Sequence, residues 1–210
     1  MYPVSYAADP AIEGRNRLTT FFRYLIAIPW LFVAALYGFV AQFAALFAWF
    51  AIVFTGRYPQ GLYDFNAGYL RMLTRVNSYT YLMTDELPSF GGEAAPDYPI
   101  AVGIAPPLDA YSRVKTFFRL IVGIPVMLLA YVQTLILSVV TLVAWFAILF
   151  TGKFPEGLFN PARSANAYLT RAGSYFLLMT EDWPPFSLDA GEGESAGAIT
   201  ATAASREVKS

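Results

Sequence analysis

The fold is decided by RYLIAIPWLFVAALYGFVAQFAALFAWFAIVFTGR, residues 23–57, which has an arginine at each end and no other ionisable side chain except tyrosine. A second version, RLIVGIPVMLLAYVQTLILSVVTLVAWFAILFTGK, occupies residues 119–153 with the same property. One bilayer crossing needs about 20 apolar residues, and each run is longer. Only 14% of the whole chain is charged, and soluble domains carry about 25%. These two runs predict an integral membrane protein.

The chain is a tandem repeat. Shifting the sequence by 96 positions aligns residues 2–90 with residues 98–186 without a gap. The segment WFAIVFTG, residues 49–56, meets WFAILFTG, residues 145–152. We therefore expect one structural unit per copy, over residues 1–91 and 98–186. The tail, residues 187–210, is small and polar, so we expect it to be disordered.

Each copy contains the same series of predicted elements. An alternating stretch at residues 2–8 or 98–105 predicts a short β-strand. An amphipathic helix follows, with large apolar residues on one face and Thr20, Arg23 and Ala27 on the other. The apolar segment covers about residues 24–54 or 120–150, and Pro29 or Pro125 should kink or restart it because proline lacks a backbone N–H.

A second amphipathic helix is expected at about residues 64–84 and 160–180. Two arginines near its middle in copy one make a membrane crossing costly, so we expect this helix at the lipid interface or against a partner helix. The predicted fold class is therefore an all-α integral membrane protein, built from two tandem repeats with a short strand opening each.

A polar turn separates the apolar segment from this second helix. Glycine suits the position after a helix end, and Asp64 and Asn160 suit the N-cap of the next helix, with Pro161 at its first position. Trp49 and Trp145 lie about two turns before the glycines and are candidate interface anchors. The repeated turn residues are Thr55, Gly56, Pro59, Gly61, Thr151, Gly152, Pro155 and Gly157.

Two arrangements of the apolar segments are open, a single kinked span or a helical hairpin that enters and leaves on one face. With single spans, residues 1–23 and 151–210 carry 3 + 5 = 8 basic residues and residues 55–120 carry 6, so the expected positive-inside asymmetry is missing. With hairpins all 14 basic residues share one side, and Gly38 or Gln133 lies near the tip. Hairpin arms of about 13 residues reach only about 20 Å into the core. We favour hairpins.

Composition argues against several function classes. Cysteine and histidine are absent, which removes thiol nucleophiles, imidazole bases and the usual zinc and haem ligands. A net charge of −1 gives no basic character for nucleic-acid binding. Neither apolar segment carries the ionisable groups that ion-coupled transporters place there. We predict no catalytic residues, no metal site, no cofactor and no enzymatic activity.

Four arginines are candidate lipid head-group contacts. Arg23, Arg75, Arg119 and Arg171 fall on the polar faces of the amphipathic helices, where a guanidinium can bind a lipid phosphate or anchor the helix without specificity. The carboxylate pairs at residues 85–86 and 181–182 are interpreted as solvated loop residues that face Arg75 or Arg171.

The repeated pattern resembles a known family. A Tyr-Pro opening, R-x-x-TFFR, an Ile-Pro, WFAI-x-FTG-[RK]-x-P-x-GL and a closing P-x-F occur twice between Tyr2 and Phe186. They are similar to those of the bacterial membrane family called domain of unknown function 4389. The resemblance implies a membrane location and no established activity. Copy two has Asn160-Pro161 where copy one has Asp64-Phe65, so the copies share no role for Asp64.

These observations predict a non-enzymatic protein of the bacterial cytoplasmic membrane, either a scaffold that organises the bilayer or an accessory subunit of an envelope assembly. The alternative is a lipid-binding or lipid-moving protein that uses the groove between the copies, and a membrane enzyme ranks third. The expected partners are membrane lipids, and beyond them other membrane proteins or a second copy of the chain. No nucleic acid is expected.

Overall fold

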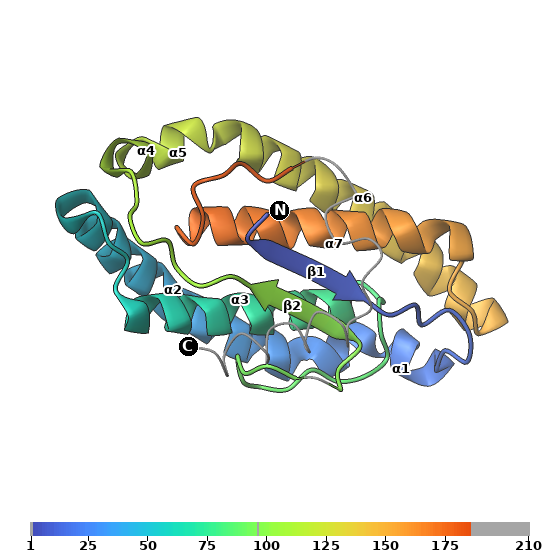
Figure 1. Ribbon diagram of the computed structural model, residues 1–210. Helices are drawn as coiled ribbons and strands as arrows, with labels where there is room; N and C mark the ends of the chain where they lie inside the picture. The colour runs from blue at the N-terminus through green and yellow to red at the C-terminus, as the bar shows by residue number, and fades with distance from the viewer. Residues whose placement is uncertain (1, 96, 186–210) are drawn as a thin grey trace.

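The computed structural model describes residues 2–95 and 97–185. It is mostly helical, with one two-stranded sheet (Figure 1). The elements of copy one are β1 Val4–Ala8, α1 Arg17–Phe21, α2 Arg23–Thr55 and α3 Gln60–Thr80. Those of copy two are β2 Ile100–Ile104, α4 Arg113–Phe117, α5 Arg119–Val122, α6 Ile124–Thr151 and α7 Glu156–Phe176. The predicted tail lies outside the described residues, so its disorder stays a prediction.

Each apolar segment forms one continuous helix at its midpoint, so the preference for a hairpin inside the segment was wrong. Gly38 is an interior residue of α2, and its lack of a side chain leaves room for Tyr69 of α3. A Cβ built on Gly38 would lie 2.7 Å from the hydroxyl of Tyr69. The chain reverses only after α2 or α6 has ended, and α3 then packs back along α2 as α7 does along α6. The reversal therefore falls at the polar turn.

The two copies differ where the apolar helix begins. α2 continues from Arg23 through Pro29, whereas copy two breaks at Gly123 and α6 restarts with a proline in its first turn. Copy one has Ala27 at the position of Gly123, and alanine favours a helix by about 1 kcal/mol over glycine. A Cβ on Gly123 would also lie 2.8 Å from a ring carbon of Phe176. The predicted restart at proline therefore applies to copy two alone.

The helices after the turn begin earlier than predicted. Pro59 and Pro155 are their N-caps, in extended conformation, because proline's fixed φ and missing N–H suit a helix start. Asp64 and Asn160 are therefore not N-caps but lie inside the helices, and Pro161 lies inside α7 rather than at its first position.

The turn itself has the predicted conformation. Gly56 and Gly152 cap α2 and α6 at φ 75° and 74°, in the left-handed region that favours glycine. The hydroxyl of Thr55 donates to the carbonyl of Ala51 at 2.6 Å, and Thr151 repeats this contact in copy two. Gly61 and Gly157 lie in the first turns of α3 and α7, with open space where a Cβ would be.

A pseudo-two-fold axis relates the two copies. β1 pairs antiparallel with β2, and the register places Tyr6 opposite Val102, its equivalent 96 positions later. Thr74 and Thr170 are also equivalent, and their hydroxyls hydrogen bond at 3.2 Å where α3 meets α7. An axis through these two pairs exchanges the copies, which Figure 1 shows as the antiparallel course of α3 and α7 behind the sheet.

The copies are interleaved rather than separate. β1 packs on α7 and β2 on α3, while α1 packs on α6 and α4 on α2. The end of each apolar helix is also joined to the chain entering the other. Tyr111 donates its N–H to the carbonyl of Gly56 at 2.8 Å, and Arg15 donates to Gly152 at 3.0 Å. α2 and α6 therefore run antiparallel on the two sides of the molecule.

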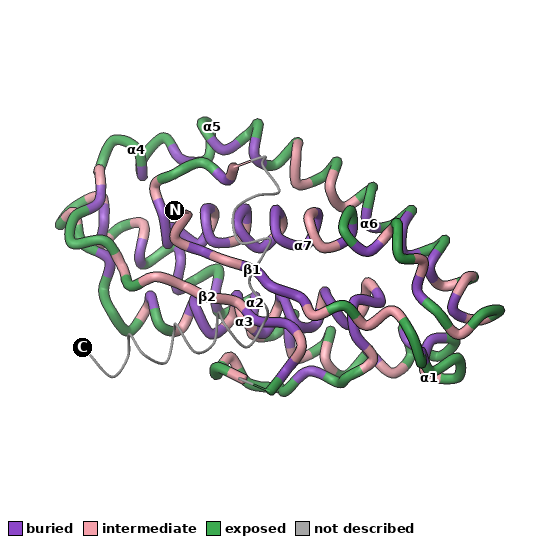
Figure 2. The backbone as a smooth tube through the Cα atoms, turned by 45° about the vertical axis from the view of Figure 1, so that its right-hand side comes forward, coloured by how far each residue is buried: buried purple, intermediate pink, exposed green. Residues whose placement is uncertain are grey.

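The amphipathic segment that comprises α1 and the start of α2 has its polar face turned inward. Thr20, Arg23 and Ala27 are completely buried, whereas Leu18 and Leu25 are 69% and 63% exposed. The same division continues along α2 and α6, whose outward sides are exposed in Figure 2. The inward residues of α2 are mostly small: Ala34, Gly38, Ala41, Ala44, Ala45 and Ala48.

We expect Gly92→Ala to lower the free energy of unfolding by about 1–3 kcal/mol, as overpacking does. A Cβ on Gly92 would overlap the backbone of Gly68 in α3, and neither backbone can give way cheaply. The matched control is Gly91→Ala, whose added methyl meets its nearest atom at 3.9 Å. Thermal unfolding in detergent measures both variants. Equal midpoints would mean that this loop does not lie against α3.

Candidate functional site

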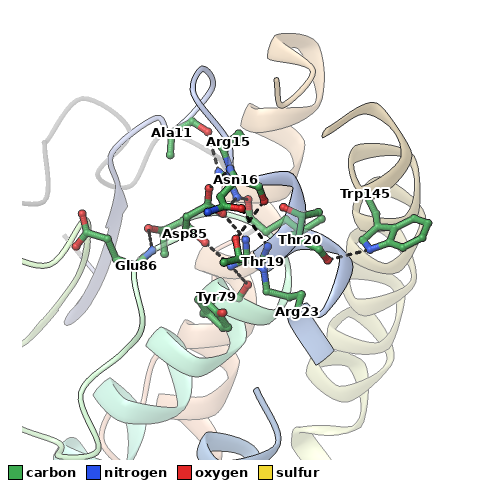
Figure 3. A network of polar contacts seen from close by, with 12 residues as sticks. Ala11, Arg15, Asn16, Thr19, Thr20, Arg23, Tyr79, Asp85, Glu86 and Trp145 are labelled. Atoms are coloured by element: carbon green, nitrogen blue, oxygen red, sulfur yellow. Dashed lines mark hydrogen bonds and ion pairs between the residues drawn. The ribbon is translucent and has the colours of Figure 1, made fainter. Parts of the chain in front are cut away.

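Buried arginines form two clusters at equivalent places, one in each copy. The Arg23 cluster comprises Arg15, Asn16, Arg23, Tyr79 and Asp85 and is drawn in Figure 3. The Arg119 cluster comprises Ser112, Lys115, Arg119, Tyr175 and Glu181. Each lies where the beginning of the long apolar region meets the loop that follows α3 or α7.

Arg23 is the centre of the first cluster, and its side chain is completely buried. Its guanidinium donates to the carbonyl of Thr84 at 2.7 Å and to that of Tyr79 at 3.3 Å. It also forms an ion pair with the carboxylate of Asp85 and lies 4.2 Å from the centre of the Tyr79 ring. A buried charge is stable only with such compensation.

Arg15 completes the cluster from the chain before α1. It donates to the carbonyls of Ala11 at 2.8 Å and Leu82 at 2.9 Å, and pairs with Asp85 at 2.9 Å. Burial lowers the pKa of Arg15, and the charge of Asp85 opposes that shift. The second carboxylate oxygen of Asp85 accepts the N–H of Asn16 at 3.0 Å. Asp85 therefore uses both oxygens to hold the entry to α1.

The carbonyls of Leu82 and Thr84, which accept from Arg15 and Arg23, follow a tight turn at the end of α3. Leu82 has φ 63°, and Met83 donates its N–H to the carbonyl of Ser78 at 2.9 Å, the six-to-one bond of a Schellman motif. The left-handed conformation costs a leucine about 1–2 kcal/mol. The side chain of Leu82 is 1% exposed, so burial offsets that cost. Leu178, at φ 64°, repeats the turn in copy two.

In the Arg119 cluster a buried arginine is also compensated by nearby groups, but some of the surrounding side chains differ from those of the Arg23 cluster. Arg119 donates to the carbonyl of Thr180 and lies 3.8 Å from the centre of the Tyr175 ring. The carboxylate of Glu181 accepts the N–H of Ser112 and pairs with Lys115 at 3.5 Å. The position of Arg15 is taken by Tyr111, whose hydroxyl donates to the carbonyl of Met179 at 3.4 Å.

Asp85 and Glu181, the first residue of each carboxylate pair, thus have other partners than predicted. Asp85 faces Arg15 and Arg23 rather than Arg75, because the turn at Leu82 directs the chain back toward the start of α1. The neighbouring Glu86 is exposed, as predicted for a loop residue, and its carbonyl accepts the hydroxyl of Tyr98 at 3.0 Å. Each cluster therefore joins the start of the long apolar region to the loop that follows the next helix, α3 in copy one and α7 in copy two.

The four arginines predicted to contact lipid head groups are not at the surface. Arg23 is 0% exposed, and Arg75, Arg119 and Arg171 are each 3% exposed. Arg75 donates to the hydroxyl of Ser89 at 3.1 Å and to the carbonyl of Glu93. The prediction of exposed polar faces was wrong because these helices turn those faces toward one another and toward the following loops.

The tryptophans of the repeated motif bind the other copy. Trp49 donates its indole N–H to the carbonyl of Thr116 at 3.0 Å, and Trp145 donates to Thr20 at 3.0 Å. Phe21 stacks on Trp145 with ring centres 6.1 Å apart. Both indole N–H groups therefore donate hydrogen bonds within the protein. That the indole rings anchor the protein at the lipid interface stays a prediction.

We expect Trp49→Phe and Trp145→Phe each to lower the free energy of unfolding by about 1 kcal/mol, the net value of one hydrogen bond. The two losses should be similar because the pseudo-two-fold axis makes the contacts equivalent. Trp183→Phe is the control, since Trp183 is 48% exposed. Thermal unfolding of the three variants measures the effect. A loss confined to one of the two motif tryptophans would contradict the equivalence.

The described residues contain no group of three or more Asp, Glu, His or Cys side chains placed to hold a metal ion. The absence of catalytic residues, metal and cofactor stays a prediction. Sequence reasoning treated Asp85 only as a solvated loop residue and did not single out Arg15. The recurrence of the acidic residue as Glu181 was a signal for Asp85, whereas Arg15 has no equivalent arginine in copy two.

A family model described as a domain of unknown function (DUF4389) matches the chain twice, over residues 17–91 and 113–187. The two matches together cover more than half of the chain, and each includes the central arginine of one cluster, Arg23 or Arg119, and one apolar helix. No curated protein and no solved structure matches the chain.

Proposed function

The chain belongs to the DUF4389 family, which it contains in two tandem copies, and we propose that it is a non-enzymatic integral membrane protein that organises the lipid bilayer. The proposal extends to its place in the cell. We assign it to the bacterial cytoplasmic membrane, where it acts alone as a scaffold or as an accessory subunit of an envelope assembly. Its partners are then membrane lipids, together with other membrane proteins.

The observation that carries the proposal is the outward face of α2 and α6. Both helices are long and apolar enough to lie in a membrane, and only 33% and 28% of their most apolar windows are buried. A helix at the centre of a soluble protein would be mostly buried. Exposed apolar patches of more than a few hundred Å² mark interaction or membrane surfaces. The most exposed large apolar side chains on α2 are those of Leu25, Phe32, Phe39, Phe47 and Phe54.

The direction of the polar side chains supports the same environment. Thr20, Arg23 and Ala27 face inward where a helix in water would turn Arg23 outward. A lipid environment rewards this arrangement, because polar groups must find their partners inside the protein. The clusters around Arg23 and Arg119 supply those partners.

The alternative of a lipid-binding or lipid-moving protein receives less support. It requires guanidinium groups that a lipid phosphate can reach, and the four arginines proposed for that task are at most 3% exposed. We therefore place bilayer organisation first.

Vesicle remodelling tests this function. Purified chain reconstituted into liposomes should tubulate them or reduce their diameter, as light scattering and electron microscopy measure. Unchanged vesicle size at high protein density would contradict bilayer organisation by the chain alone. A lipid species that stays bound in stoichiometric amount through purification would favour the alternative.

A further inference from the structure

We propose that α2 and α6 lie along one leaflet of the bilayer rather than across it. In this orientation the pseudo-two-fold axis follows the membrane normal, the apolar faces of both helices sink into the acyl chains of that leaflet, and the sheet lies on the water side. The inference rests on the proposed membrane function and specifies which surface of the protein meets lipid.

The first argument is the length of the apolar face. Leu25 and Phe54 of α2 are 63% and 70% exposed, and no charged residue lies between them. They are 54 − 25 = 29 positions apart, which is about 44 Å along an α-helix. The hydrocarbon core is about 30 Å thick. A crossing that covered this face would need a tilt above about 45°, beyond the usual range of membrane helices.

The second argument is an exposed charge at half the length of α2. Gly92 lies against Gly68 of α3, and a Cβ on Gly68 would lie 2.6 Å from the hydroxyl of Tyr37, near the middle of α2. Glu93 follows Gly92 and is exposed. If α2 crossed the bilayer, its middle would lie at the centre of the hydrocarbon and so would this carboxylate, which is costly. In the one-leaflet orientation Glu93 lies at head-group level.

The third argument is that the two ends of the molecule carry the same charge. Arg113 lies beside Gly56 at the end of α2, and Arg17 lies beside Gly152 at the end of α6. Arg57 and Lys153 follow these glycines, and all four basic residues are exposed. A crossing along the long axis would place equal positive charge on both sides of the membrane, against the positive-inside rule. The one-leaflet orientation places both ends on one side.

The arrangement of layers fits one leaflet. β1 packs on α7 and β2 on α3, while α2 and α6 flank those helices. In Figure 1 the sheet lies in front and α2 and α6 recede behind α3 and α7. Because the axis exchanges α2 with α6, both reach the same depth when it is normal to the membrane. A protein that adds volume to one leaflet in this way is a wedge, which gives the proposed bilayer-organising function a mechanism.

Site-directed labelling tests the orientation, since the full chain contains no cysteine. Gln60→Cys and Glu156→Cys are equivalent exposed positions at the starts of α3 and α7, on opposite ends of the molecule. Glu93→Cys lies between them. A membrane-impermeant maleimide is added to sealed right-side-out vesicles and, separately, to sealed inside-out vesicles. It should label all three cysteines in one kind of vesicle and none of them in the other kind.

Labelling of Gln60→Cys and Glu156→Cys from opposite sides, with Glu93→Cys protected on both, would overturn the inference and leave the membrane function intact. Recovery of the chain in the soluble fraction would overturn the membrane function as well. A second measurement gives depth directly, with a bimane attached through Leu25→Cys, Phe39→Cys or Phe54→Cys and quenched by doxyl lipids. The one-leaflet orientation predicts one common depth. A shallow, deep and shallow sequence would overturn it.

Discussion

Arg23→Met is expected to lower the free energy of unfolding by about 3 kcal/mol, the low end of the cost of breaking a buried ion pair, because the Asp85 side chain is 27% exposed. Methionine fills much of the same volume, so the loss reports the charge rather than a cavity. The carbonyl of Thr84 loses the guanidinium donor, that of Tyr79 keeps only backbone donors such as the N–H of Leu82, and Asp85 keeps only Arg15 as an ionic partner. Chemical or thermal unfolding in detergent measures the effect.

The matched control for this variant is Arg57→Met. Arg57 also adjoins α2 but is exposed, and surface charges contribute little to stability. The unfolding midpoint of Arg57→Met should equal that of the parent chain. If Arg23→Met were no more destabilising than Arg57→Met, the Arg23 cluster would not stabilise the contact between the start of α2 and the loop after α3.

The second large effect is expected on membrane binding rather than on folding. Phe39 and Phe43 point outward from the middle of α2, 65% and 48% exposed, with ring centres 5.1 Å apart. Replacing both by aspartate costs as much as about 3 kcal/mol for each carboxylate held at hydrocarbon depth. Each 1.4 kcal/mol is about tenfold in a binding constant, so the vesicle-bound fraction should fall by orders of magnitude.

The control for the double variant is Phe39→Leu with Phe43→Leu, which keeps the surface apolar and should bind vesicles as the parent chain does. Both variants should unfold in detergent at the parent temperature, because neither side chain belongs to the buried core. Undiminished binding of the double aspartate variant would show that this face of α2 does not meet lipid. If the double aspartate variant unfolded at a lower temperature than the parent chain, Phe39 and Phe43 would contribute to the stability of the fold rather than only to contact with lipid.

The repeat and its local elements could be predicted from sequence because each has a local signal. The 96-residue offset identified Tyr6 with Val102 and Thr74 with Thr170 as equivalent positions, but that these equivalent residues pair with one another is known only from the structure. The strand at each opening, the helix end at Gly56 and the helix that follows the turn were all anticipated within a few residues.

The placement of side chains was harder, because amphipathic patterns do not say which face is inside. For a helix in water, Arg23 and Arg75 would be assigned to the solvent side. In this chain most exposed large side chains of α2 are apolar, Gln42 being an exception, and the interior of the helix consists mostly of small residues together with Arg23. The hairpin preference failed for a related reason, since Gly38 serves close packing against Tyr69 and not a turn.

The interleaving of the copies leaves no local trace in sequence. Trp49 carries the pattern of a residue at a membrane interface, yet its N–H bonds to Thr116 of the other copy. Arg15 has no equivalent arginine in copy two, where Tyr111 takes its place, so comparison of the copies does not reveal its contact with Asp85. Such contacts depend on the relative placement of segments that lie more than 60 residues apart.

The central claim is that the outward faces of α2 and α6 are covered by lipid, and flotation tests it most directly. Purified chain is freed of detergent in the presence of liposomes and centrifuged in a density gradient, then washed with alkaline carbonate. We predict that it floats with the vesicles and resists the wash, and that without lipid it aggregates. A chain that remained monodisperse in plain buffer and stayed in the dense fractions beside the liposomes would contradict the claim.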